Sequence, residues 1–197
     1  MAIPVRYRTE MADARTLRAA DWSRAALAVI AVGGVDRITV EGLARQLGVT
    51  KGSCYWHFAD RAALISGALE MWEREATLDV IEELRRIPDP ALRLRTLFET
   101  SFGDTEHGPI DVALVTRVDD PIVGPVVSRV TAKRIAFLEE VYRELGLTAG
   151  RAAGQARITY CTYVGHFQVR RSLPDDGLLA EPTSAYLRQL LETVTAR

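Results

Sequence analysis

The sequence has few of the residues that mark metal centres, disulfide scaffolds or membrane segments. Its 197 residues include two cysteines and three histidines, and Cys54 and Cys161 lie too far apart to form a metal-binding spacing. The N-terminus has no apolar signal core, and the longest apolar run, near residues 25–35, is far shorter than the ~20 residues that span a bilayer. We therefore expect a cytoplasmic protein with reduced cysteines and without a metal, a cofactor or a membrane partner.

The chain has no excess of basic residues. Its net charge of −1 excludes a nucleic-acid binder that is basic throughout. The charge is unevenly distributed. Residues 1–65 hold nine of the 25 basic and six of the 26 acidic residues, so the remainder is acidic. The hydrophobic content of 48% is ordinary for a globular protein of one or two domains. A basic N-terminal unit on an acidic body fits a DNA-binding head whose body avoids DNA.

The stretch 39–58 predicts two short helices joined by a tight turn. Thr39 is a good N-cap for a first helix, and Gly48 ends that helix because glycine tolerates the left-handed conformation of a C-cap. Thr50 then caps a second helix that runs to about His57. Apolar residues at helical spacing give the first helix a buried stripe. This pattern indicates a helix-turn-helix.

The second of these helices carries a polar and aromatic face. Cations, hydroxyl groups and amphipathic rings within two turns suit contacts with phosphate oxygens and base edges, and the helix N-terminus adds free N–H donors. An ordinary amphipathic helix with Tyr55 and Trp56 half-buried is the alternative. Because the caps, the turn glycine and the polar face agree, DNA recognition is the favoured interpretation.

Residues 49–64 resemble the N-terminal signature of the tetracycline-repressor (TetR) family of transcriptional regulators. The resemblance covers roughly residues 21–64, and its most specific element is a Tyr-x-His-Phe core followed by a basic residue. Two positions depart from the usual pattern: Cys54 stands where leucine is common, and Arg61 where lysine is common. The first departure thins the local core, whereas the second keeps the charge.

The chemistry of the individual side chains predicts their roles on DNA. Lys51 and Arg61 are expected to clamp phosphates, while Ser53 and Trp56 face the groove with Arg45 in reach of base edges. The predicted DNA-binding residues are Thr39, Arg45, Thr50, Lys51, Ser53, Tyr55, Trp56, His57 and Arg61.

Helical periodicity continues through the rest of the chain, with no repeat and no convincing strand, so we predict an all-α fold of about nine helices. We divide the chain into an N-terminal arm and helix-turn-helix domain, residues 1–60, and an effector-binding and dimerisation domain, residues 61–197. The expected helix 148–172 is apolar nearly all round, so it should be buried on more than one side. The other expected helices are 14–32, 39–47, 50–57, 60–86, 91–102, 109–118, 124–145 and 182–195.

The resemblance to the TetR family implies a body that binds a small-molecule effector and forms a homodimer through the helices 148–172 and 182–195. It implies a repressor that binds a palindromic double-stranded DNA operator and is released when the effector swings the 60–86 helix. Two recognition helices would then lie about 34–36 Å apart, or a multiple of that distance. The candidate effector-binding residues are Phe98, Phe102, His107, Arg117, Phe137, Tyr142, Tyr160, Tyr163, His166 and Phe167.

Two other functions are compatible with the sequence. A helical metal-dependent enzyme could use His107, Asp111, Asp119 and Asp120, but these residues lack the i, i+4 pairing of a helical metal site, and Asp119-Asp120 before Pro121 is better explained as a helix cap. A DNA-binding protein without a small ligand is the other alternative.

Overall fold

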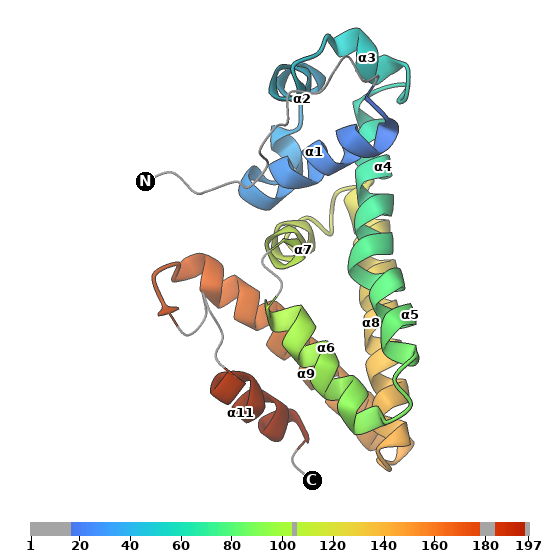
Figure 1. The fold of residues 1–197 in the computed structure, drawn as a ribbon, viewed down its shortest axis with the longest axis vertical. Coiled ribbons are helices and arrows are strands. Elements are labelled where there is room, and N and C mark those ends of the chain that lie inside the picture. The colour runs from blue at the N-terminus through green and yellow to red at the C-terminus, as the bar shows by residue number, and fades with distance from the viewer. Residues whose placement is uncertain (1–16, 104–105, 178–183, 196–197) are drawn as a thin grey trace.

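The structure is a computed structural model that describes residues 17–103, 106–177 and 184–195. Every regular element in these ranges is a helix, which confirms the predicted all-α fold (Figure 1). The head contains α1 (Ala19–Gly33), the 3-10 turn η1 (Val35–Arg37), α2 (Val40–Leu47) and α3 (Lys51–Tyr55). The body contains α4 (Arg61–Glu73), the π-helical segment η2 (Arg74–Leu78), α5 (Asp79–Arg85), α6 (Pro90–Gly103), α7 (His107–Val115), α8 (Val123–Glu144), α9 (Ala149–Ser172) and α11 (Ser184–Thr195).

Helix α1 begins later than its apolar pattern predicts. Leu17 and Arg18 precede the helix, and the predicted first turns before them lie outside the described residues. The start is fixed by Asp21, whose carboxylate accepts the backbone N–H of Arg18 over 2.8 Å. The helix ends as predicted at Gly34, whose φ of 78° is readily available only to glycine.

The predicted caps set the geometry of the helix-turn-helix. Thr39 Oγ1 accepts the N–H of Gly42 over 3.0 Å, and Gly48 adopts the left-handed conformation with φ 71° and ψ 27°. Helix α3 is shorter than predicted, because the N–H groups of residues 57 and 58 both donate to the carbonyl of Cys54 and close the helix. Thr50 occupies the N-cap position but makes no side-chain capping bond.

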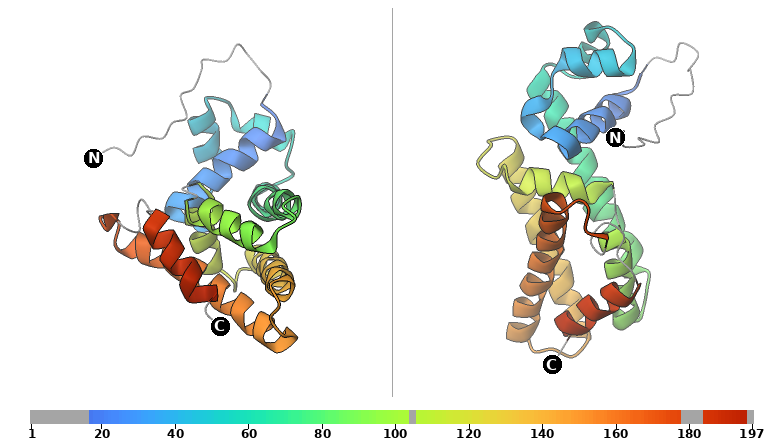
Figure 2. Two further views of the ribbon diagram at one scale, coloured as in Figure 1. Left: turned by 60° about the horizontal axis from the view of Figure 1, so that its bottom comes forward. Right: turned by 90° about the vertical axis from the view of Figure 1, so that its left-hand side faces the viewer.

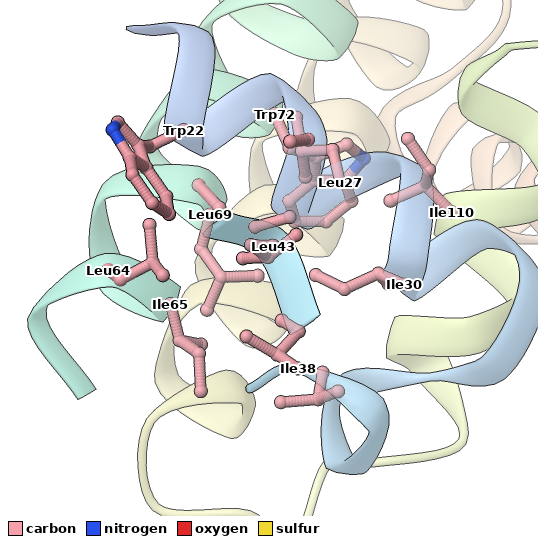
Figure 3. Packing of buried hydrophobic residues seen from close by; sticks show 14 of the residues in the cluster. Trp22, Leu27, Ile30, Ile38, Leu43, Leu64, Ile65, Leu69, Trp72 and Ile110 are labelled. Atoms are coloured by element: carbon pink, nitrogen blue, oxygen red, sulfur yellow. The ribbon is translucent and has the colours of Figure 1, made fainter. Parts of the chain in front are cut away.

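The core of the head continues into the body. Figure 3 shows Trp22 and Ile30 of α1 near Leu43 of α2 and Leu64 of α4, and all four side chains are at most 1% exposed. The same apolar cluster includes Ile110, which α7 contributes. The apolar packing therefore continues across the predicted boundary between residues 60 and 61. Burial of each large apolar side chain in this cluster contributes about 1.5–3 kcal/mol to the stability that the head and α7 share.

Helix α4 carries the head and leads into the body. Asp60 caps it as predicted, because its Oδ1 accepts the N–H of Ala63 over 2.8 Å. Figure 1 shows α4 running down from the head toward α5. Between them the helix widens to the π-helical segment η2, a feature that the apolar pattern of a single 60–86 helix did not predict. Such segments turn the next helix relative to the last and occur frequently at functional sites.

Helix α8 starts at Val123, and Pro125 lies in its first turn, where a missing N–H leaves no intrahelical bond unmade. The start predicted near residue 124, after Pro121, is thus confirmed. Asp120 caps the helix, because its Oδ1 accepts the N–H groups of Ile122 and Val123 over 2.8 and 3.1 Å. These two hydrogen bonds lower the pKa of Asp120. The interpretation of this aspartate as a cap is confirmed.

Helix α9 packs beside α8 and also contacts α6, α7 and α11, so it is covered on more than one side as predicted (Figure 2). Ile158 is 55% exposed and Val169 is 45% exposed, so one face of α9 is open within a single chain. The stripe of α11 instead packs on the second apolar cluster, which α6 and α9 help to form. The predicted start of the last helix at 182 lies outside the described residues. No helix in the described ranges combines the length and apolar character needed to cross a membrane.

Candidate nucleic-acid interface and ligand cavity

Helix α3 presents large aromatic side chains to solvent. Trp56, in the turn that ends the helix, is 88% exposed, and Tyr55 is 51% exposed. The alternative of a half-buried amphipathic face therefore does not describe Trp56. The opposite side of α3 is anchored by Cys54, which is fully buried, and burial raises the pKa of its thiol. Cys54 is thus a packing group rather than a reactive thiolate.

The predicted DNA-binding residues share one property, which is access to solvent. Ser53 is half-buried and the others are exposed. Lys51 Nζ lies 3.7 Å from Glu41 Oε1, but both side chains are 64% exposed. Such a surface pair contributes little, so a phosphate can replace the carboxylate at small cost. The exposed residues are Thr39, Arg45, Thr50, Lys51, Tyr55, Trp56, His57 and Arg61.

Two of these residues also hold the head together. Arg61 donates from Nε to the carbonyl of Ile38 over 2.7 Å and from Nη2 to that of Val35 over 2.9 Å. The ring nitrogen Nε2 of His57 lies 2.6 Å from the carbonyl oxygen of Leu17. Their phosphate contacts stay predictions, whereas the structure gives each a role in joining α3 and α4 to the rest of the head.

A cavity in the body collects six of the ten residues predicted to bind an effector. It lies between η2, α6, α8 and α9. The centre of a water molecule can occupy a volume of about 90 Å³ inside it. One water needs about 10–15 Å³ of such space, so the cavity holds a molecule of several heavy atoms. The six are Phe98, Phe102, His107, Phe137, Tyr160 and Tyr163.

The remaining candidates lie elsewhere. Arg117 Nη2 pairs with Asp36 Oδ1 of η1 over 2.8 Å, so this side chain joins the body to the head. Phe167 packs against α7, where a Cβ added to Gly108 would lie 2.1 Å from its ring. Each of these side chains has a contact between helices, and their contact with an effector stays a prediction. Two more are buried outside the cavity lining: His166 and Tyr142.

His166 packs among the aromatic side chains of α6 and α11. Its Nδ1 lies 3.1 Å from the hydroxyl of Tyr186, and its ring meets that of Phe102 at 5.1 Å between centroids. Burial, followed by the charge of Arg170, lowers the pKa of the imidazole. His166 therefore supports the cavity wall from behind.

No pattern in the sequence indicated the charged group at the cavity wall. Arg134 of α8 donates to Asp111 of α7 over 2.5 Å and to Thr77 of η2 over 2.9 Å. Asp111 also accepts from Trp72 of α4 and from the hydroxyl of Tyr163, at 2.7 and 2.6 Å. Burial would lower the pKa of Arg134, but the charge of Asp111 more than offsets this effect and the pKa is raised. Asp111 thus joins the helices that carry the head to those that line the cavity.

Asp111 was also the candidate metal ligand of the enzyme alternative. Its two oxygens accept from Trp72, Arg134 and Tyr163, which leaves a buried ion pair in place of an open coordination site. Among the described residues, no three His, Cys, Asp or Glu side chains are placed to hold a metal ion.

A second ion cluster lies where α4 meets η2. Glu73, with a side chain 9% exposed, accepts from Arg129 and from Lys133, the latter over 2.7 Å. The hydrogen bond from Arg129 is the largest cause, aided by Lys133, that lowers the pKa of Glu73 to about 2. These contacts tie the end of α4 to α8.

Known proteins resemble this chain in its N-terminal sequence and in its whole fold. Residues 24–68 match the family described as bacterial regulatory proteins, tetR family. The HTH-type transcriptional regulator SrpR of Pseudomonas putida is 35% identical over 60 residues, which are 30% of this chain and only 28% of that relative. The chain thus spans less than a third of that relative's own length.

Solved structures extend the likeness in fold to the body. A TetR-family transcriptional regulator from Agrobacterium tumefaciens matches with a TM-score of 0.75 and 24% identity, over 90% of this chain and 97% of that chain. The transcriptional regulator FadR from Bacillus subtilis, in complex with stearoyl-CoA, matches with a TM-score of 0.69 and 16% identity, over 91% and 98%. Residues 24–68 thus match the tetR family of bacterial regulatory proteins, and about nine-tenths of the chain shares the fold of these solved structures.

Proposed function

We propose that this protein is a DNA-binding transcriptional repressor that a small molecule releases from its operator. The observation that carries the proposal is the exposed face of α3, with Trp56 88% and Tyr55 51% exposed beside Lys51. Large rings that a protein leaves in water lose their burial energy unless a partner covers them. Here they lie beside a cation, on a short helix fixed by a buried Cys54, which suits the major groove of DNA.

The contacts with DNA divide into two kinds. Lys51 is the phosphate contact, aided by the free N–H groups at the start of α3. Trp56 and Ser53 face the bases, with apolar contact available to thymine methyl groups. Arg45, at the exposed side of α2, lies on the same helix-turn-helix and is the second cation available to the DNA.

A homodimer would present two such heads to a palindromic operator. The exposed faces of α8 and α9 form an open groove lined by small residues, among them Ala132, Ala136, Cys161 and Gly165. Small side chains allow a second pair of helices to approach closely. The stripe of α11 is already packed on α6 and α9, so we place the interface on α8 and α9 rather than on α9 and α11.

The effector site is the cavity beside η2. FadR, which shares this fold, is in complex with stearoyl-CoA, so a body of this kind can hold a ligand. A ligand that fills the cavity contacts Ala76 and Thr77 of η2, and a shift of η2 would move α4 and the head. Such a ligand lowers operator affinity only if it binds the DNA-free conformation more tightly.

A footprint on the DNA flanking the protein's own gene tests the proposal. We expect protection of two half-sites related by a dyad, which is lost when an effector is added. A regulator without a small ligand would keep its footprint in every ligand tested, and absence of specific protection would contradict the DNA-binding function.

Oligomeric state tests the placement of the interface. Ala136→Arg in the α8–α9 groove should convert a dimer to a monomer in sedimentation experiments. Ala91→Arg, an equally exposed alanine on α6, is the matched control and should leave the dimer intact. Dimers in both variants would contradict an interface on α8 and α9.

A further inference from the structure

The body cavity is built mainly from rings and aliphatic side chains. Phe98 and Phe102 stack with centroids 5.1 Å apart, and Tyr163 meets Phe102 edge-on at 5.7 Å. Val80 and Ile81 close the side formed by α5. Aromatic walls of this kind favour a flat ring, because stacked and edge-on contacts add to the burial of apolar area.

Arg134 is the only described lining residue with a permanent charge, and that charge is already balanced. The side chain of Arg134 is 14% exposed and that of Asp111 only 4%. Its donors are also occupied: Nε by Thr77, Nη1 by Asp111, and Nη2 by the carbonyl of Ala76 over 3.0 Å. A carboxylate entering the cavity would therefore compete with Asp111 for a guanidinium that has few N–H groups to spare.

The hydroxyl groups of the lining are likewise committed to the protein. Tyr163 donates to Asp111, and the hydroxyl of Tyr160 lies 3.0 Å from Thr131 Oγ1. Thr159 Oγ1 lies 2.6 Å from the hydroxyl of Tyr142. The hydroxyl oxygens of Tyr160 and Thr159 can each accept one further hydrogen bond, which would orient a ligand without adding charge.

From these contacts we infer that the cavity binds a small neutral aromatic molecule and discriminates against charged analogues of the same shape. An anion would have to draw Arg134 away and leave Asp111 buried without its partner, whereas a cation would face Arg134 before it reached Asp111. A neutral ring carrying one hydroxyl brings no charge that competes for Arg134 or Asp111, so the ion pair stays intact. Its transfer from water costs little when the hydroxyl is hydrogen-bonded. This inference rests on the proposed function, of which it names the effector class.

Three probes of nearly equal size test the inference: benzyl alcohol, benzoate and benzylammonium at pH 7. Binding to the full-length protein is measured by ligand-observed NMR and isothermal titration. We expect benzyl alcohol to bind at least tenfold more tightly than either charged probe. Equal or tighter binding of benzoate or benzylammonium would overturn the inference, and so would the absence of binding by all three.

A matched pair of variants locates the binding site. Leu97→Trp fills the cavity from α6 and should abolish binding of benzyl alcohol. Leu92→Trp lies on the same helix at a position that is 50% exposed, and should bind benzyl alcohol like the wild type. Equal binding by both variants would place the probe elsewhere and overturn the inference.

A change of charge gives a second, independent readout. Asp111→Asn frees the charge of Arg134, and should raise the affinity for benzoate relative to benzyl alcohol at least tenfold. An unchanged ratio would overturn the role of the ion pair, and the Leu97 and Leu92 variants decide the site should the Asp111 variant not fold. Operator binding without any probe is measured separately. Its loss contradicts the proposed repressor, whereas intact operator binding with the wrong probe preference contradicts only the effector class.

Discussion

Trp72 Nε1 donates to Asp111 Oδ1 over 2.7 Å, and both side chains are almost fully buried. Trp72 belongs to the helix that carries the DNA-binding head, and Asp111 balances the arginine in the wall of the body cavity. One carboxylate thus joins α4, α7, α8 and α9. A hydrogen bond thus connects the helix that carries the head to the ion pair at the cavity wall.

Removing the charge of Asp111 should destabilise the fold. Asp111→Asn leaves Arg134 buried without a counter-charge, and breaking one side of a buried ion pair costs about 3–5 kcal/mol. Urea unfolding followed by circular dichroism measures the loss. Trp72→Phe removes only the neutral donor and should cost about 1 kcal/mol. If Asp111→Asn lowered the free energy of unfolding by less than the ~1 kcal/mol expected for Trp72→Phe, the carboxylate would not be needed to balance Arg134.

Trp72→Phe should also weaken the coupling between ligand and DNA. The variant keeps the DNA-binding face and the cavity lining, so its affinities for operator and for effector, each measured alone, should remain within a few-fold of wild type. The drop in operator affinity caused by effector should shrink, because one of the bonds that relates the two sites is gone. A ligand titration in a mobility-shift assay gives the coupling directly, and an undiminished drop would rule out this route.

Glu73 should make stability depend on pH in the acid range. Its pKa is about 2 in the folded protein, below the ordinary value of 4.5, so its contribution is complete above about pH 4.5. The contribution then falls as pH drops from 4.5 toward 2. Because Arg129 and Lys133 are 46% and 40% exposed, solvent screening reduces it to about 1–2 kcal/mol.

Glu73→Gln is the variant that isolates this contribution. It should be less stable than wild type at pH 6, and the difference should narrow as the pH falls below 4.5. Unfolding curves at a series of pH values measure both proteins. A difference that stays constant down to pH 2.5 would show that the ionised carboxylate contributes nothing.

Lys51 and Trp56 should affect DNA binding in different ways. Lys51→Ala removes a phosphate contact, so it should weaken binding to all sequences and reduce the slope of log K against log salt by about one. Trp56→Ala should relax the preference for the operator and leave that slope unchanged. Val32→Ala, at a position on α1 that is 83% exposed, serves as the control. Identical salt slopes for the Lys51 variant and wild type would exclude Lys51 as a phosphate contact.

Gly108 should tolerate no side chain. A Cβ there would lie 2.1 Å from the Phe167 ring, so Gly108→Ala must separate α7 from α9, and overpacking of this kind costs about 1–3 kcal/mol. Gly154→Ala on α9 has open space and should stabilise the helix by about 0.5–1 kcal/mol. Adding Phe167→Leu to Gly108→Ala should recover part of the loss, and strictly additive losses in thermal unfolding would contradict the contact.

The sequence by itself determined the local structure of the head. Thr39 and Gly48 cap α2 through groups of their own and through neighbours within four residues along the chain, so their roles follow from local chemistry. Asp60 and Asp120 cap their helices for the same reason. The polar and aromatic character of the α3 face was also readable from the sequence, because it depends on residue types within two turns, whereas the end of the helix at Tyr55 was not.

Only the tertiary structure decided what the body does with its polar residues. Asp111 and Arg134 are 23 residues apart and Trp72 and Asp111 are 39 apart, so no spacing in the sequence relates them. Arg117 pairs with Asp36, which lies 81 residues away along the chain, so the sequence could not indicate this contact either. The exposure of α9 was equally hidden, since an apolar helix does not reveal whether its own chain or a second copy covers it. Local caps depend on neighbours in sequence, whereas buried charge depends on which helices meet in space.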